Sequence, residues 1–99
     1  MKSTLQRLSE WYVAQCDGDW EHGSGLKIST LDNPGFAVNI DLQDTILESR
    51  PYPEMKDLYE TNDQWMICRR TDRTFEGRGA PSRLEDILKE FLRWAEAMP

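Results

Sequence analysis

Hydrophobic positions near the start of the chain recur at the spacing of an α-helix. In residues 4–16 the apolar positions lie three and four residues apart, at Leu5, Leu8, Tyr12 and Cys16. This pattern predicts an amphipathic helix. Ser3 and Gln6 have the spacing of a capping box at its start. Gly18 is placed to end the helix in a left-handed conformation.

A second helical pattern closes the chain. Ser82 is placed as its N-cap, and Glu85 has the capping-box position three residues later. The apolar face of this predicted helix consists of Leu84, Ile87, Leu88, Phe91, Leu92 and Ala95. The regular stripe makes it the clearest element of the sequence.

Between the helices the pattern changes to alternation, which is typical of β-strands. Residues 25–31 and 36–42 alternate and are separated by Asp32-Asn33-Pro34-Gly35, so they predict a hairpin. Pro34 presets the backbone at the first corner of the turn, and Gly35 accepts a positive φ at the second.

The middle of the chain alternates less regularly. Strands are expected at 45–49, 64–70 and 73–78, and residues 54–60 fit either a strand or a weak helical turn. In 64–70 one face carries Met66 and Cys68, and the other carries Trp65 and Ile67. The expected connections are turns at 41–44 and 71–72, an irregular break at 50–53 and a loop at 77–81.

The order helix, strands, helix predicts an α+β fold. We expect a single antiparallel sheet of about four to six strands, with the N-terminal and C-terminal helices packed on one face. The 99 residues form one domain, 1–99, large enough for one modest core.

Composition limits where the protein acts. No apolar run approaches the ~20 residues of a membrane-spanning helix. The first residues lack the apolar run of a signal peptide. We therefore expect a cytoplasmic protein that binds no membrane. In that compartment Cys16 and Cys68 are expected to be reduced and buried rather than bridged.

The net charge of −6 is unevenly spread along the chain. Residues 10–63 hold twelve acidic and three basic side chains, a net charge of −9. Residues 64–83 hold five arginines and two acidic side chains, a net charge of +3. An acidic majority argues against nucleic-acid binding and suits a basic protein partner or simple solubility.

The segment after the first helix concentrates ionisable groups around one aromatic residue. It carries Asp17, Asp19, Glu21 and His22 beside Trp20. A metal site is disfavoured, because the remaining features of a calcium loop and further zinc ligands are missing. The first interpretation is structural, with an aspartate capping the helix exit and Trp20 in the core. The second is a protein interface, with acidic side chains around an aromatic residue. Both can hold.

Three other motifs suggest chemistry only weakly. Cys68 lies five positions before Arg73, which loosely resembles a sulfurtransferase loop, but no glycine cradles the sulfur. A thiol nucleophile at Cys16 with His22 as base lacks a third orienting group. Residues 77–79 lack the full pattern of a phosphate loop. We therefore expect no catalytic residues, no cofactor and no bound metal.

Several motifs together resemble one family, immunity protein 53 of bacterial polymorphic toxin systems. They are Trp11-Tyr12, Gln15-Cys16-Asp17-Gly18, Trp20-Glu21-His22, Gly25, Thr30, Asp32-Asn33-Pro34-Gly35, Asp41-Leu42, Thr45, Trp65, Cys68, Phe75-Glu76-Gly77 and Leu84, Leu88 and Phe91. The resemblance runs nearly end to end. Two departures are mild: Phe36 stands where a tryptophan is expected, and Ala80 where a glycine is usual.

The resemblance implies a cytoplasmic antitoxin that binds and neutralises one secreted toxin domain. The acidity of this chain suggests that the toxin is a nuclease, whose surface must be basic. A monomer that binds no nucleic acid is expected. The alternatives are a small cysteine-dependent sulfurtransferase-like enzyme and a scaffold or regulatory binding domain. The dense acidic run places the expected toxin-binding surface at Asp17, Asp19, Glu21, His22, Asp32, Asn33, Asp41 and Asp44.

Overall fold

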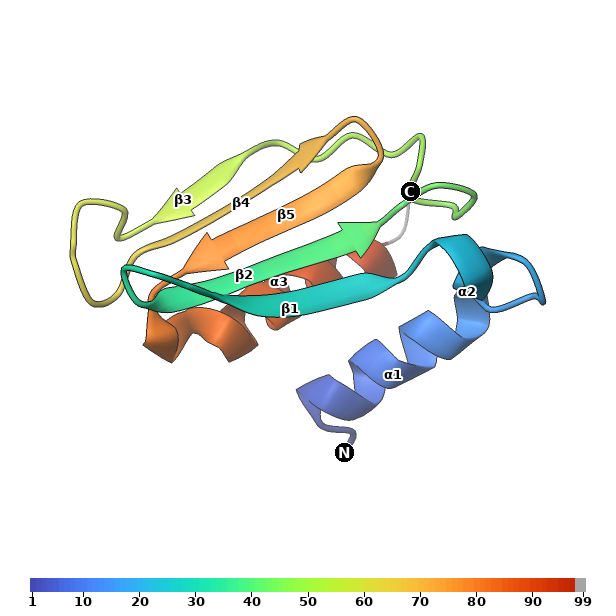
Figure 1. Ribbon diagram of the computed structural model, residues 1–99, viewed down its shortest axis with the longest axis horizontal. Coiled ribbons are helices and arrows are strands. Elements are labelled where there is room, and N and C mark those ends of the chain that lie inside the picture. Colours follow the sequence, from blue (N-terminus) through green and yellow to red (C-terminus); the bar gives the residue numbers. More distant parts are fainter. Residues whose placement is uncertain (98–99) are drawn as a thin grey trace.

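The alternating segments build one five-stranded antiparallel sheet, shown in the computed structural model, which describes residues 1–97 (Figure 1). The order across the sheet is β1-β2-β5-β4-β3. The strands are β1 (Leu26–Leu31), β2 (Gly35–Asp41), β3 (Met55–Asp57), β4 (Met66–Thr71) and β5 (Thr74–Gly79). The predicted α+β fold class with an N-terminal and a C-terminal helix is confirmed, and residues 54–60 contain a strand.

The helices are α1 (Thr4–Gln15), a short α2 (Trp20–Gly23) and α3 (Leu84–Glu96), which follows the 3-10 turn η1 (Pro81–Arg83). The predicted capping box of α1 is confirmed: Ser3 Oγ accepts from the Gln6 amide at 3.1 Å, and Gln6 Oε1 accepts from the Ser3 amide at 2.8 Å. Helix α3 covers one face of the sheet, and α1 packs against α3 beside the edge strand β1 (Figure 1).

The core lies between α3 and the sheet and is rich in aromatic rings. Phe75 of β5 lies 5.2 Å from Phe91 and 6.1 Å from Trp94 between ring centroids, and Tyr52 packs on Phe75 at 5.4 Å. Met66 and Cys68 of β4 are buried on the same face, as the alternation predicts. The opposite face of the sheet, which we call the outer face, has no helix on it in the described part of the chain (Figure 1).

The strand predicted at 45–49 is wrong. Residues 43–50 form turns that begin a crossover, residues 42–54, from β2 to the far edge of the sheet. The guanidinium of Arg70 donates to the backbone oxygens of Leu47 at 2.8 Å and Glu48 at 2.6 Å. These carbonyls are satisfied by a side chain that no local pattern reveals, so strand pairing is not needed there.

Three further local predictions are wrong. Residues 77–79 belong to β5 and do not form a loop. Ser82 does not cap α3: its hydroxyl donates to the Asp63 carbonyl, and the helix starts through η1. Gly35 has no positive φ but lies in β2, where a Cβ would overlap the backbone oxygen of Gly79. The glycine is required by close strand packing, not by the turn. Gly18 does have a φ of 98°, two residues beyond the C-cap of α1.

We expect Gly77→Ala to destabilise the fold by about 1–3 kcal/mol, because overpacking a core has costs of this order. A Cβ at Gly77 would overlap Cγ2 of Ile87, the side chain through which α3 contacts β5. Chemical denaturation measures the change. Gly23→Ala is the matched control, since nothing lies within 4 Å of a Cβ there. Equal stability of the two variants would contradict this packing.

Candidate functional site

The acidic segment between α1 and β1 is held by its own carboxylates. Asp17 Oδ1 accepts from the backbone amides of Asp19 and Trp20, each at 3.0 Å. Glu21 accepts from the amides of Asp17 at 3.0 Å and Gly18 at 3.0 Å. The backbone hydrogen bonds lower the pKa of Asp17 below its ordinary value. These two carboxylates therefore support the structural interpretation of the segment.

Trp20 is part of the core and offers no exposed aromatic ring. It is 5% exposed, and its indole nitrogen donates to the Gln43 carbonyl at 2.8 Å. Its ring packs against Trp11 at 6.1 Å and Tyr12 at 6.0 Å. The hydrogen bond from Trp20 to Gln43 joins α2 to the crossover. Asp44, which follows Gln43, therefore lies at the same end of the molecule as the acidic segment. The structural interpretation, with Trp20 in the core, is confirmed, and the interface interpretation keeps only the acidic side chains around this ring.

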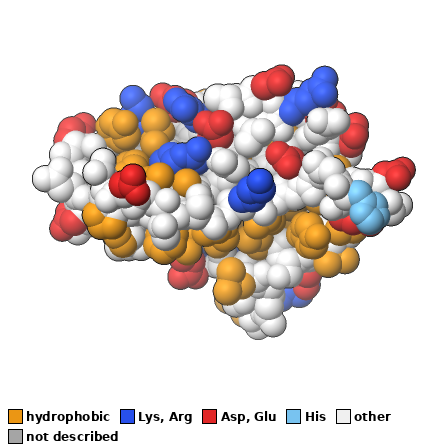
Figure 2. Space-filling view, in the orientation of Figure 1, with side chains coloured by type: hydrophobic (Ala, Val, Ile, Leu, Met, Phe, Trp, Pro, Cys, Tyr) orange, Lys and Arg blue, Asp and Glu red, His pale blue; other side chains and the backbone are white. Residues whose placement is uncertain are grey.

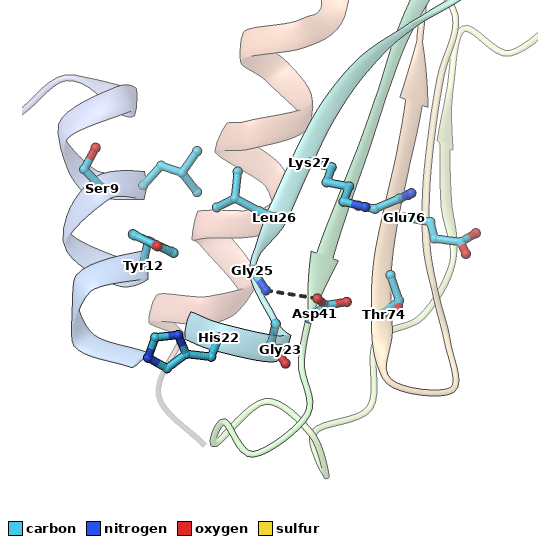
Figure 3. Close-up of a pocket in the computed structure, with 13 residues that line it drawn as sticks. Ser9, Tyr12, His22, Gly23, Gly25, Leu26, Lys27, Asp41, Thr74 and Glu76 are labelled. Carbon is cyan, nitrogen blue, oxygen red and sulfur yellow. Dashed lines mark hydrogen bonds between the residues drawn. The ribbon is translucent and has the colours of Figure 1, made fainter. Parts of the chain in front are cut away.

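His22 and Asp41 line the same groove, which has a volume of about 850 Å³ (Figure 3). Its walls are Leu8, Ser9 and Tyr12 of α1, residues 22–27, and Asn39, Asp41, Thr74 and Glu76 of the sheet. Figure 3 shows Asp41 reaching the amide of Gly25, at 3.0 Å, so this carboxylate also has a structural role. The lining of the groove combines apolar side chains with the basic Lys27 and the acidic Asp41 and Glu76.

The predicted toxin-binding residues divide into two groups. Asp17, Asp19, Glu21, His22, Asp41 and Asp44 lie at the α2 end of the sheet. Asp32 and Asn33 lie at the opposite end of the β1–β2 hairpin, because Leu26 pairs with Ile40 and Leu31 with Gly35. Six strand residues separate the ends by roughly 20 Å. Asp19 and Asp44 are exposed.

The arginine-rich segment 69–83 is not a free basic surface. Arg69 pairs with Glu76 at 3.1 Å, and Arg73 pairs with Glu48 at 3.2 Å. Arg83 contacts Asp57 and Asp86. The remaining two guanidiniums donate to carbonyl oxygens, with Arg78 also reaching Asn39 Oδ1 at 2.9 Å. The local excess of positive charge is therefore used within the fold.

The two cysteines are free and differ in burial. Cys68 is fully buried, and this burial raises the pKa of its thiol to about 12. A thiol in that state is a poor nucleophile at neutral pH, which disfavours the sulfurtransferase interpretation. Cys16 is not buried as expected but half-buried, because it lies just past the last turn of α1.

Sequence reasoning missed two aromatic residues that lie together at one end of the outer face, the half-buried Trp65 and the exposed Tyr59. Trp65 alternates with the buried Met66 and therefore points away from the core, and it contacts Tyr59 edge-on at 6.1 Å. Tyr59 is 47% exposed. The alternation at residues 65–68 was the available signal, but it does not reveal that this face stays uncovered.

Across residues 1–97 the structure is that of an α+β protein. Acidic side chains without a structural contact, such as Asp19 and Asp44, and the ring of Tyr59 are exposed on its surface. In that range no group of three or more His, Cys, Asp or Glu side chains could hold a metal ion. None of the described helices is long and apolar enough to cross a membrane.

Comparison with protein families matches the family model described as Immunity protein 53 to residues 5–96. Because this match covers nearly the whole chain, the chain belongs to the Immunity protein 53 family. The curated proteins and the solved structures include no match to it.

We expect Asp17→Ala to lower the melting temperature, because two backbone amides lose their acceptor. Asp17→Asn should melt close to the original protein at neutral pH, since the amide oxygen still accepts. The depressed folded-state pKa makes the carboxylate's contribution present above pH about 4 and lost as pH falls through the folded pKa. Melting from pH 7 to pH 2 measures both effects. Equal melting of the Ala and Asn variants would contradict this role.

A thiol reagent should label Cys16 in the native protein and leave Cys68 unlabelled until the protein unfolds. The reason is the difference in burial and the raised pKa of Cys68. Mass spectrometry of peptides after timed labelling distinguishes the two sites. If Cys68 in the native protein is labelled as fast as Cys16, the result contradicts its burial and supports the reactive-thiol interpretation.

Proposed function

We propose that this protein is an immunity protein that binds one cognate secreted toxin domain, one to one, in the bacterial cytoplasm. The observation that carries the proposal is the family match over residues 5–96. Binding alone blocks the toxin, and the protein itself acts as a monomer without catalysis. The buried, weakly nucleophilic Cys68 is in keeping with a role that needs no reactive side chain.

A nuclease is the toxin class that the charge favours. A nuclease surface must attract phosphates and is therefore basic. This chain carries −6, and its arginines 69–83 are engaged in contacts within the fold, so its exposed acidic side chains can face such a surface. Complementary charge also speeds association, which suits a protein that must capture an incoming toxin.

The acidic and polar residues at the two ends of the hairpin are the proposed contacts with the toxin. They are Asp17, Asp19, Glu21, His22, Asp41 and Asp44 at the α2 end, and Asp32 and Asn33 at the hairpin tip. Asp19 and Asp44 are the best placed of these to steer a partner, because they are exposed and no side-chain hydrogen bond of theirs occurs among the described residues.

The deciding experiment pairs the chain with the toxin domain encoded by the neighbouring gene. Expression of that domain should arrest growth, and co-expression of the chain should restore it. The purified pair should elute as a one-to-one complex by light scattering. A toxin domain that stays fully active in excess immunity protein would refute the proposal and leave the scaffold alternative.

Asp19→Asn combined with Asp44→Asn should slow association with that toxin domain by roughly two- to fivefold at low salt, with little change in dissociation. The asparagine at position 44 keeps a side chain that tolerates the observed φ of 62°. Stopped-flow or surface plasmon resonance kinetics at two salt concentrations measure the association rate, and high salt should mask the difference.

The matched control neutralises two other exposed acids, Glu10 and Glu54, and changes the net charge by the same amount. It should slow association less. If both double variants associate at the same rate, only the total charge matters and the location of the acidic contacts is refuted.

A further inference from the structure

Apolar side chains gather at one end of the outer face of the sheet. We call Leu31, Tyr59, Trp65 and Ile67 the aromatic patch. Trp65 lies in the same cross-sheet row as Leu31, because the Trp65 carbonyl accepts from the Ala80 amide at 3.0 Å and Leu31 pairs with Gly35. Figure 2 shows hydrophobic side chains at this end, near the β1–β2 turn and the loop after β3.

Small residues lie between the side chains of the outer face and are covered by them. Gly35, Ala37 and Ala80 lie on the outer face by strand alternation, yet Ala37 is only 6% exposed and Ala80 is fully buried. Since no described helix covers this face, the neighbouring outer-face side chains must cover them. Trp65 is further held edge-on by Tyr59, whose ring lies 4.9 Å from Lys56 Nζ.

Charged side chains of both signs border the aromatic patch. Lys56 and Arg78 flank Ile67 across the sheet, but Lys56 pairs with Glu54 at 3.9 Å and Arg78 donates to Asn39 Oδ1 at 2.9 Å. Residues 57–64 hold three acidic side chains and no basic one. Asp57 pairs with Arg83, but Glu60 and Asp63 are exposed and form no ion pair among residues 1–97, and the same is true of Asp32 at the hairpin tip. An apolar centre with a charged border is how protein interfaces are organised, and Trp and Tyr are enriched where binding energy concentrates.

We propose that the aromatic patch is the surface that holds the toxin domain, and that it takes a basic toxin surface with an apolar side chain at its centre. This inference rests on the proposed function. The exposed charges beside the patch that have no ion-pair partner among residues 1–97 are acidic, and they select this occupant: a second copy of the chain carries −6 and would place the like charges of Asp32, Glu60 and Asp63 against each other. A basic partner meets them with opposite charge.

The division of roles gives the patch a kinetic signature. Exposed acids act over a Debye length and govern association, whereas buried aromatic contacts govern dissociation. Tyr59→Ala and Trp65→Ala should each raise the dissociation rate from the neighbouring gene's toxin domain by about tenfold or more, with association changed little. Val13→Ala and Ile46→Ala are the matched controls, because they truncate apolar side chains that are 64% and 75% exposed elsewhere.

The experiment measures dissociation kinetics of the full chain and melting of every variant. Faster dissociation of Tyr59→Ala, and of Trp65→Ala if it folds, in variants that melt like the original and with controls unchanged, supports the inference. Tyr59, on a loop and 47% exposed, decides the matter if Trp65→Ala fails to fold. Original-rate dissociation of a folded Tyr59→Ala overturns the surface assignment while the proposed function stands. Failure of the unmodified chain to bind the toxin overturns both. A dimer of the chain that Tyr59→Ala dissolves also overturns it, because the patch then holds a second copy.

Discussion

The close contact between α3 and β5 is the constraint on which the rest of the structure depends. Gly77 and Gly79 carry no side chain where Ile87 approaches the strand, so the helix can sit directly on the middle of the sheet. That position lets Phe91 and Trp94 reach Phe75 and close the core on one face. Most of the large buried side chains are used there or beside α1, and among residues 1–97 no helix forms a second apolar layer on the other face. The outer face therefore stays uncovered by any described helix.

The sequence predicted those parts of the fold whose signals are local. The helical stripe of α3, the capping box at Ser3 and the alternation on both sides of the β1–β2 turn each arise from neighbouring residues. The errors arise where distant residues decide. Gly35 is required by the backbone of Gly79, across the sheet, and the turns at residues 43–50 are satisfied by a guanidinium more than twenty positions away.

The same distinction separates charge in the sequence from charge on the surface. Residues 64–83 carry +3, but the fold directs Arg70 into the carbonyls of the crossover and joins Arg69 and Arg73 to acidic partners. The acidic segment divides in the same way, since Asp17 accepts backbone hydrogen bonds while Asp19 remains exposed. The run of acids in the sequence therefore does not distinguish carboxylates that cap backbone amides from carboxylates that stay exposed to solvent.

Charge and apolar area have different consequences for an inhibitor of this kind. Exposed acidic groups attract many basic surfaces, and their attraction weakens with salt, so they cannot alone hold one toxin against its competitors. Aromatic side chains have few rotatable bonds, so they lose little conformational freedom on binding, and they exclude water from the contact. Tyr59 and Trp65 contact each other before any partner arrives, so part of the ordering has already occurred in the free protein. The outer face, which no described helix covers, thus supplies a surface where both kinds of group lie together.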